Sequence, residues 1–170
     1  MVTSVMRNVC RIGIAVLVLA GAYATVSAQP CPKGQFLAKY YKNENLQGVP
    51  FFTKCEKTIN NSWGNSGPTK VTGGSSNPKA DGGSTIIELG IDHFSVQWTG
   101  EFNFAGGDTT FVATADDGIK VWVDNELIID EWRVQGVREF RATRNLSAGT
   151  HRVKVQYYEN AGPATARVTW

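Results

Sequence analysis

An antiparallel β-sandwich or barrel with one domain is the fold class that this sequence of 170 residues predicts. Beyond residue 28 the apolar residues show no helical period, and in several short runs they alternate with polar residues, as in half-buried strands. Glycine, asparagine and aspartate separate these runs, which is typical of all-β domains. About 140 residues remain beyond residue 28, enough for one hydrophobic core.

The amino-terminal segment, residues 1–28, has the composition of a secretory signal peptide. Arg7 and Arg11 precede an apolar run over residues 12–24, and Val26-Ser27-Ala28 fits the small-x-small pattern of a cleavage site. A membrane anchor is the alternative, but the run is short for a bilayer span. We therefore expect a secreted or cell-surface protein without membrane insertion after signal cleavage.

Cleavage of this segment would leave the protein formally neutral. It would remove two of the 17 Lys and Arg residues and none of the 15 Asp and Glu residues. A neutral chain without a basic patch does not favour nucleic acid or an anionic membrane surface as its partner.

The three cysteines divide between the two parts of the chain, because Cys10 lies in the predicted signal. Cys31 and Cys55 would reach an oxidising compartment, so we expect them to form a disulfide, with two free thiols as the alternative. The bridge would tie the N-terminal segment, residues 29–35, to the domain proper, residues 36–170. It would contribute about 3 kcal/mol to stability.

The alternating pattern places the predicted strands. It is clear at residues 94–98, where Phe94, Val96 and Trp98 are separated by polar residues. Trp98, Trp122 and Trp170 lie within predicted strands, and we expect them in the core. In chain order, strands are predicted at residues 36–41, 86–89, 94–98, 101–104, 109–115, 119–124, 127–130, 137–143, 152–157 and 164–170.

One segment differs in composition from the rest. Between residues 60 and 84, Gly, Ser, Asn and Pro occupy 17 of 25 positions. We expect a long surface loop here, either a disordered insertion or a loop that faces a ligand.

The strand order predicts which loops lie together, because alternate connections of consecutive antiparallel strands fall at the same end of a sandwich. Counting from the turn at residues 116–118, the connections near Asn125 and at residues 144–149 lie at the opposite end. The loops at 116–118, 131–136 and 159–163 are therefore expected to share one end.

The turn Asp116-Asp117-Gly118 is the strongest candidate for a metal site, although an ordinary hairpin turn would also favour Asp and Gly. Two adjacent carboxylates repel each other, and a cation such as calcium, which takes 6 to 8 oxygen ligands, removes that cost. Asn160 could add an amide oxygen, and backbone carbonyls around Gly162 could add more.

The run from Phe111 to Trp132, which contains this turn, resembles the domain family named after the amino-terminal fragment of anthrax protective antigen. Other segments follow in the family's order, and the resemblance covers residues 36–170 and implies the family's β-sandwich fold. These segments are Phe36–Tyr41 with Asn45–Gly48, Phe94–Gly100, Leu146–Gly149, and Tyr157–Asn160 leading to Trp170.

The resemblance also implies a function, although the family includes sugar-binding adhesins, modules of glycosidases and a toxin segment that is not a lectin. In the adhesins, adjacent aspartates joined by a cis peptide bind calcium, which implies this role for Asp116 and Asp117. Asn160 matches the adhesins' asparagine ligand, and a carbonyl near Gly162 would complete the protein ligands. Neighbouring sugar hydroxyls would take the remaining calcium positions.

Three further residues are candidates for contact with the sugar. Trp63 and Trp132 could offer a stacking face, and Arg133 could offer hydrogen bonds. Core packing is the alternative for Trp132.

Catalysis is not expected. Glycoside hydrolysis needs two carboxyls about 5 to 9.5 Å apart, on opposite sides of the sugar, whereas Asp116 and Asp117 are adjacent. His93 and His151 have no Cys or Ser motif at a usable spacing, so each is interpreted as a surface or strand-edge residue. The alternative function is a structural or adhesive module that meets another protein or itself, through a strand edge at Trp170.

Overall fold

The computed structural model describes residues 31–72 and 85–170, and in this part of the chain all regular structure is antiparallel β-sheet. This confirms the predicted fold class. The strands are β1 (Phe36–Tyr41), β2 (Phe52–Glu56), β3 (Ile59–Gly64), β4 (Thr69–Thr72), β5 (Thr85–Glu88), β6 (Phe94–Asp116), β7 (Gly118–Val123), β8 (Glu126–Glu131), β9 (Arg138–Glu159) and β10 (Ala164–Thr169).

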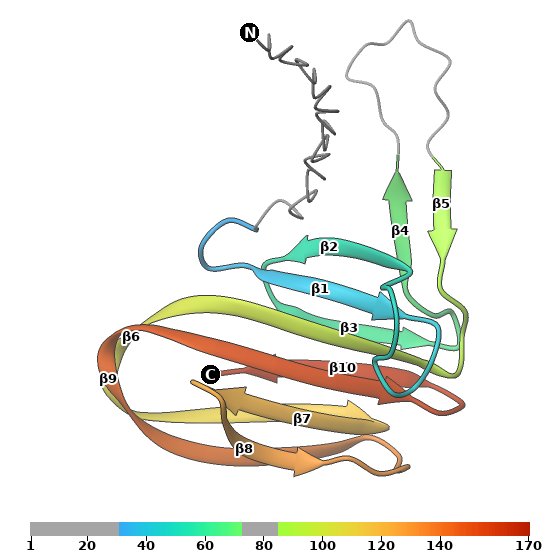
Figure 1. The fold of residues 1–170 in the computed structure, drawn as a ribbon. Coiled ribbons are helices and arrows are strands. Elements are labelled where there is room, and N and C mark those ends of the chain that lie inside the picture. The colour runs from blue at the N-terminus through green and yellow to red at the C-terminus, as the bar shows by residue number, and fades with distance from the viewer. Residues whose placement is uncertain (1–30, 73–84) are drawn as a thin grey trace, which may run out of the picture.

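Two long strands, β6 and β9, hold the sandwich together. They pair along nearly their whole length, and both bend midway, so that each strand contributes to both layers (Figure 1). One layer has the order β2-β1-β6-β9-β7-β8, and the second half of β6 pairs with β10, which in turn pairs with β3. The strands β4 and β5 form a separate ribbon that projects from the body (Figure 1).

The bend depends on glycine. Gly106 has φ +90°, and a Cβ atom there would lie 2.9 Å from the backbone nitrogen of Ala148 on the paired strand. A side chain would therefore clash and would also be strained at this φ. The predicted connection at 144–149 and the predicted break between the strands at 101–104 and 109–115 are wrong, because the β6–β9 ladder continues through this bend.

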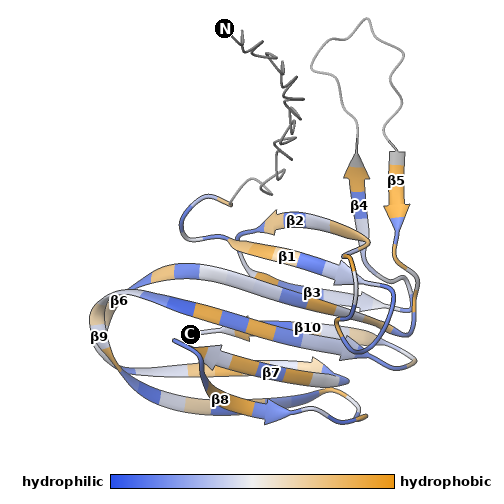
Figure 2. Cartoon of the chain, in the orientation of Figure 1, coloured by the Kyte–Doolittle hydropathy of each residue, from blue (hydrophilic) through white to orange (hydrophobic). Residues whose placement is uncertain are grey.

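The core lies between the layers and follows the alternation of the strands, which Figure 2 shows as alternating colours along β6, β7 and β9. Trp98 is fully buried, as predicted. Trp122 is not in the core, because Ile119 and Val121 occupy the inward positions of β7 and leave Trp122 on the outer face. Trp170 is 42% exposed, although its ring packs 5.0 Å from that of Phe102.

The segment at residues 60–84 is not one long loop, which corrects the prediction. Residues up to 64 belong to β3, which pairs with β10, and residues 69–72 form β4. Composition could not reveal β3, because its partner strand lies about a hundred residues further along the chain. Residues 73–84 lie outside the described part.

The predicted disulfide is present between Cys31 and Cys55, whose Cα atoms lie 5.6 Å apart. It attaches the segment before β1 to β2. The predicted signal, residues 1–28, lies outside the described residues, and within them no helix has the length and apolar character needed to cross a membrane.

Candidate functional site

Three loops meet at one end of the sandwich, as the strand order predicts. The buried carboxylate of Asp117 accepts hydrogen bonds from the backbone N–H groups of Gln135 and Asn160, both at 2.8 Å. The side-chain amide of Gln135 donates in return to the backbone carbonyl of Asp117 at 3.0 Å. Asp117 therefore joins the loops at 131–136 and 159–163 to its own turn.

The turn at Asp116-Asp117-Gly118 is not a hairpin, because β6 and β7 do not pair with each other. It carries the chain from the end of β6, which pairs with β10, to β7, which pairs with β8 and β9. The peptide bond between Asp116 and Asp117 is cis, as the resemblance implies. The requirement of a hairpin turn therefore does not explain these residues.

Glu159 completes a group of three carboxylates. One oxygen from each of Asp116, Asp117 and Glu159 can be chosen so that all lie within 4.8 Å of one another. Glu159 is fully buried, and its Oε1 atom has no hydrogen-bond partner among the described residues. Glu159 is not among the predicted ligands, but it lies two residues beyond Tyr157 and four beyond Val155 on the inward side of β9, and this alternation is a sequence signal for a buried acid.

The Tyr157 hydroxyl links Glu159 to the aspartate turn. The Tyr157 hydroxyl contacts both the Asp116 carbonyl oxygen and Glu159 Oε2, the latter at 2.6 Å. Tyr157 is the donor in both contacts, so its single hydroxyl hydrogen is shared between the two acceptors. Burial raises the pKa of Glu159 to about 7 and outweighs the hydrogen bond from Tyr157, which lowers it; the charges of Asp117 and Asp116 add to the rise.

The same environment acts on Asp116. Burial and the adjacent Asp117 raise the pKa of Asp116, although a hydrogen bond from the Val137 backbone lowers it. Three carboxyl groups thus share a small volume with no cation from the described residues against them. A bound positive ion would lower the cost of ionising them.

Asn160 follows Glu159 in the chain, and residues from other segments bind its loop. Its side-chain nitrogen donates to Glu44 Oε1 at 3.1 Å, and its carbonyl accepts from the backbone of His93 at 3.1 Å. The backbone N–H of Gly162 donates to Asp92 Oδ1 at 3.0 Å. Asn160 thus contacts Asp117 through its backbone N–H and Glu44 through its side chain.

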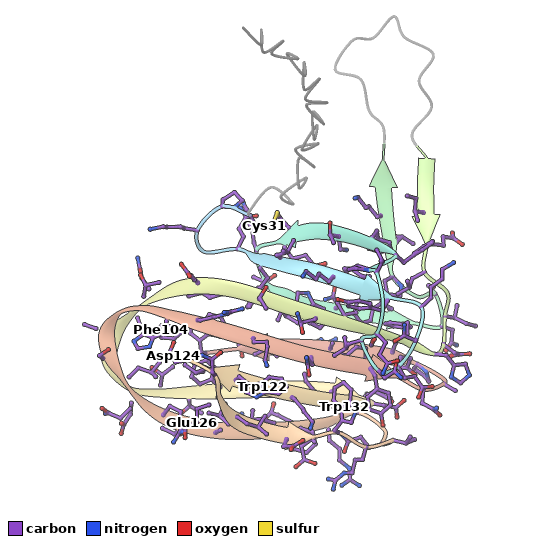
Figure 3. The ribbon with its side chains drawn as sticks, in the orientation of Figure 1. Cys31, Phe104, Trp122, Asp124, Glu126 and Trp132 are labelled. Atoms are coloured by element: carbon purple, nitrogen blue, oxygen red, sulfur yellow. A yellow bond between two sulfur atoms is a disulfide. The ribbon has the colours of Figure 1, made fainter. Side chains whose placement is uncertain are left out.

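The predicted sugar-contacting residues lie at different depths. Trp132 is at the same end of the molecule (Figure 3), and its ring centroid lies 4.7 Å from that of Tyr158. Arg133 is exposed and pairs with Glu131 at 2.8 Å and with Gln135 at 3.2 Å.

Trp63 is part of the wall behind the site. It is half-buried in β3, with its ring 5.5 Å from that of Phe94 and 5.7 Å from that of Tyr157. Core packing accounts for this position without a ligand.

His151 lies at the opposite end and is buried, so of its two predicted settings, the surface or a strand edge, the surface is wrong. Its Nδ1 atom lies 2.5 Å from Asp124 Oδ2, and its Nε2 atom lies 3.0 Å from the Ser147 carbonyl and 3.2 Å from the Ser147 hydroxyl. A catalytic histidine would need a free lone pair on Nε2 to accept the serine proton. Here Nε2 must donate to the carbonyl, so the three residues form a structural link between β9 and the β7–β8 turn.

The donor set at the three-loop end fits a hard cation. It consists of carboxylate oxygens, and it includes a buried carboxyl oxygen without a partner in the described part of the chain. Calcium binds oxygen ligands of these kinds, whereas sites for zinc use mainly nitrogen and sulfur.

Comparison with known proteins identifies the fold family. The profile of the PA14 domain matches residues 33–170. The chain belongs to the PA14 domain family. It is 29% identical, over 134 residues, to the anti-sigma-I factor RsgI3 of Acetivibrio thermocellus, a match that covers 78% of this chain and 18% of that protein.

Two solved structures are similar in fold. An anti-sigma factor domain-containing protein from Clostridium clariflavum superposes with a TM-score of 0.61 at 28% identity, over 81% of this chain and 41% of the other. The PA14 sugar-binding domain from an RTX adhesin superposes with a TM-score of 0.59 at 20% identity, over 81% and 89%. This PA14 chain thus spans less than half the length of the anti-sigma relatives, and its family includes carbohydrate-binding domains of adhesins.

Proposed function

We propose that this PA14 domain is a secreted or cell-surface carbohydrate-binding module that uses calcium at Asp116 and Asp117. The observation that carries the proposal is the meeting of three loops at this cis-linked aspartate pair, with Glu159 and Asn160 beside it. The sugar-binding PA14 domain of the RTX adhesin supports it by likeness of fold.

Asp116, Asp117 and the amide oxygen of Asn160 would hold the ion, and a backbone carbonyl near Gly162 would add a further oxygen. When bound, calcium supplies a positive centre whose open positions accept two neighbouring sugar hydroxyls. Asp117 is fixed for this role by the backbone N–H groups of Gln135 and Asn160. Glu159 would lie behind the ion and balance its charge by giving up a proton.

Trp132 and Arg133 would shape the sugar pocket beside the ion. The ring of Trp132, which packs on Tyr158, offers an apolar face to the C–H groups of a pyranose. Arg133 orients Gln135, which bonds Asp117. The site would bind and release its ligand without breaking a bond.

Calcium titration of the mature protein by calorimetry tests the metal. The wild type should bind one ion, and Asp116→Asn should weaken binding by at least about tenfold, because a ligand charge is lost. Asp130→Asn is the matched control, since this exposed aspartate pairs with Lys120 at 3.1 Å and should leave binding unchanged. Equal binding by the three proteins, or no binding by the wild type, would contradict the metal assignment.

Self-association is a second function for which the structure offers a specific surface. The edge at Trp170 does not provide it, because β10 lies between β3 and β6. On the β4–β5 ribbon, however, Val71 and Ile86 are paired across the strands and are 65% and 60% exposed. Exposed apolar strands of this kind can pair with another chain. Sedimentation that shows a monomer at all concentrations would exclude this function.

A further inference from the structure

A groove crosses the end of β10, away from the aspartate pair. Its volume is about 570 Å³, in the range of small-molecule sites. Thr165 of β10 is paired with Asp116, so Trp170 lies about 17 Å further along the strand direction. Trp170 packs 5.6 Å from Phe104, which lies at the bend end of the molecule, whereas Trp132 lies at the other end (Figure 3).

Aromatic side chains form part of the groove. Trp170 is 42% exposed, and its ring is supported by Phe102 at 5.0 Å and by Phe36 at 6.2 Å. Because Phe36 is buried and Phe102 is half-buried, the indole rests on a fixed apolar base. An exposed indole held in this way offers a surface on which a sugar ring can stack.

Two cationic side chains also line the groove. Lys57 and Arg167 both line it and are exposed, and neither forms an ion pair with any described residue. The acid in the lining, Glu139, is already bound by Arg141, with contacts of 2.7 and 2.8 Å. The amide of Asn60 and the hydroxyl of Thr114 add neutral hydrogen-bonding groups.

We infer that this groove is a second ligand site that binds a carboxylated sugar, such as a uronic-acid unit of an acidic polysaccharide. The Trp170 ring would stack on the pyranose, and the guanidinium of Arg167 would form paired hydrogen bonds with the carboxylate. Lys57 would contribute a second positive charge, and Asn60 would bond ring hydroxyls. This binding needs no metal and does not depend on Asp116 and Asp117.

Calorimetry of the mature protein in calcium-free buffer, prepared on a chelating resin, tests the inference. The probes are trigalacturonic acid and neutral α-1,4-linked galactotriose, which differ in the carboxylates alone. The acidic trimer should bind at least about tenfold more tightly, and Arg167→Gln should remove about tenfold of its affinity. Arg138→Gln removes an arginine outside the groove and serves as a control. This variant and Asp116→Asn should each change the affinity for the acidic trimer by less than about twofold. In NMR spectra, the indole N–H signal of Trp170, assigned by its absence in Trp170→Phe, should shift as the acidic trimer is added.

Three results would overturn the inference: no binding of the acidic trimer at millimolar concentration, equal binding of the two trimers, or equal losses in Arg167→Gln and Arg138→Gln. Loss of binding in Asp116→Asn would assign the acidic trimer to the aspartate site instead. Thermal unfolding of each variant shows that the fold is retained. Failure here leaves the calcium titration of Asp116 unaffected, so the two proposals can be separated.

Discussion

At Gly118 the backbone passes so close to Tyr158 that no side chain fits. A Cβ atom at Gly118 would lie 2.0 Å from Cε1 of the Tyr158 ring, although the φ of Gly118 is not in the left-handed region. Glycine is therefore required at position 118 because the Tyr158 ring packs directly against the backbone there. Sequence reasoning could place the glycine next to the aspartates, but it could not reveal the Tyr158 ring, which β9 brings there from 40 residues further along the chain.

We predict that Gly118→Ala destabilises the protein by about 2 kcal/mol, because overpacking a tight contact displaces the backbone or Tyr158. Urea unfolding measures the change. Gly136→Ala is the control: its Cβ would meet no atom within 4 Å, and its φ is not positive. Equal stability of the two variants would show that Tyr158 moves without cost.

At the scale of elements, the sequence pattern predicted many of the strands well and the way they join less well. The boundaries of β1 agree with the alternation, because a half-buried strand leaves a local signal. The continuity of β6 and β9 through their bend could not be predicted, because Gly106 and Gly149 resemble loop residues. The shared end of the three loops was nevertheless predicted correctly, since a bend reverses the chain direction as a loop does.

The link between β9 and the β7–β8 turn depends on the charge of His151. The hydrogen bond with Asp124 raises the pKa of His151, and the same bond lowers the pKa of Asp124. The histidine contributes stability below its unfolded pKa of about 6.5, and this is lost as the pH rises through its folded pKa. The aspartate contributes above about pH 4, and this is lost as the pH falls through its folded pKa.

We therefore predict that His151→Gln lowers the melting temperature most between about pH 4 and 6.5, and much less at about pH 9. Differential scanning fluorimetry across this range measures the effect. Asp124→Asn should abolish most of the pH dependence of the difference, because His151 loses its charged partner. If His151→Gln lowers the melting temperature equally at about pH 5 and at about pH 9, the contribution of His151 comes from packing and not from its charge.

For the whole molecule, the sandwich separates two kinds of surface. The loops around Asp116 gather carboxylates at one end, and the groove at Trp170 gathers aromatic rings and cations towards the other. The formal neutrality expected of the mature chain conceals this separation. Sequence reasoning found the first surface through loop order, but the groove requires Lys57 and Trp170 to come together from distant parts of the chain.

The disulfide acts at the same scale, because it closes a separation of 24 residues around β1 and the start of β2. We predict that replacing both Cys31 and Cys55 with Ser lowers the free energy of unfolding by about 3 kcal/mol. Urea unfolding of the double variant, compared with the oxidised wild type, measures the loss. A change below about 1 kcal/mol would show that the sandwich holds this segment without the bridge.

The central claim is that calcium at Asp116 and Asp117 mediates the recognition of a sugar. A glycan array probed with the mature protein tests it most directly, with calcium present, with calcium removed by a chelator, and with Asp116→Asn. We predict that the wild type binds neutral glycans when calcium is present and not when a chelator has removed it. Asp116→Asn should bind these glycans neither with calcium nor with the chelator. Neutral-glycan signals that persist in chelator, or that Asp116→Asn retains, would contradict the claim.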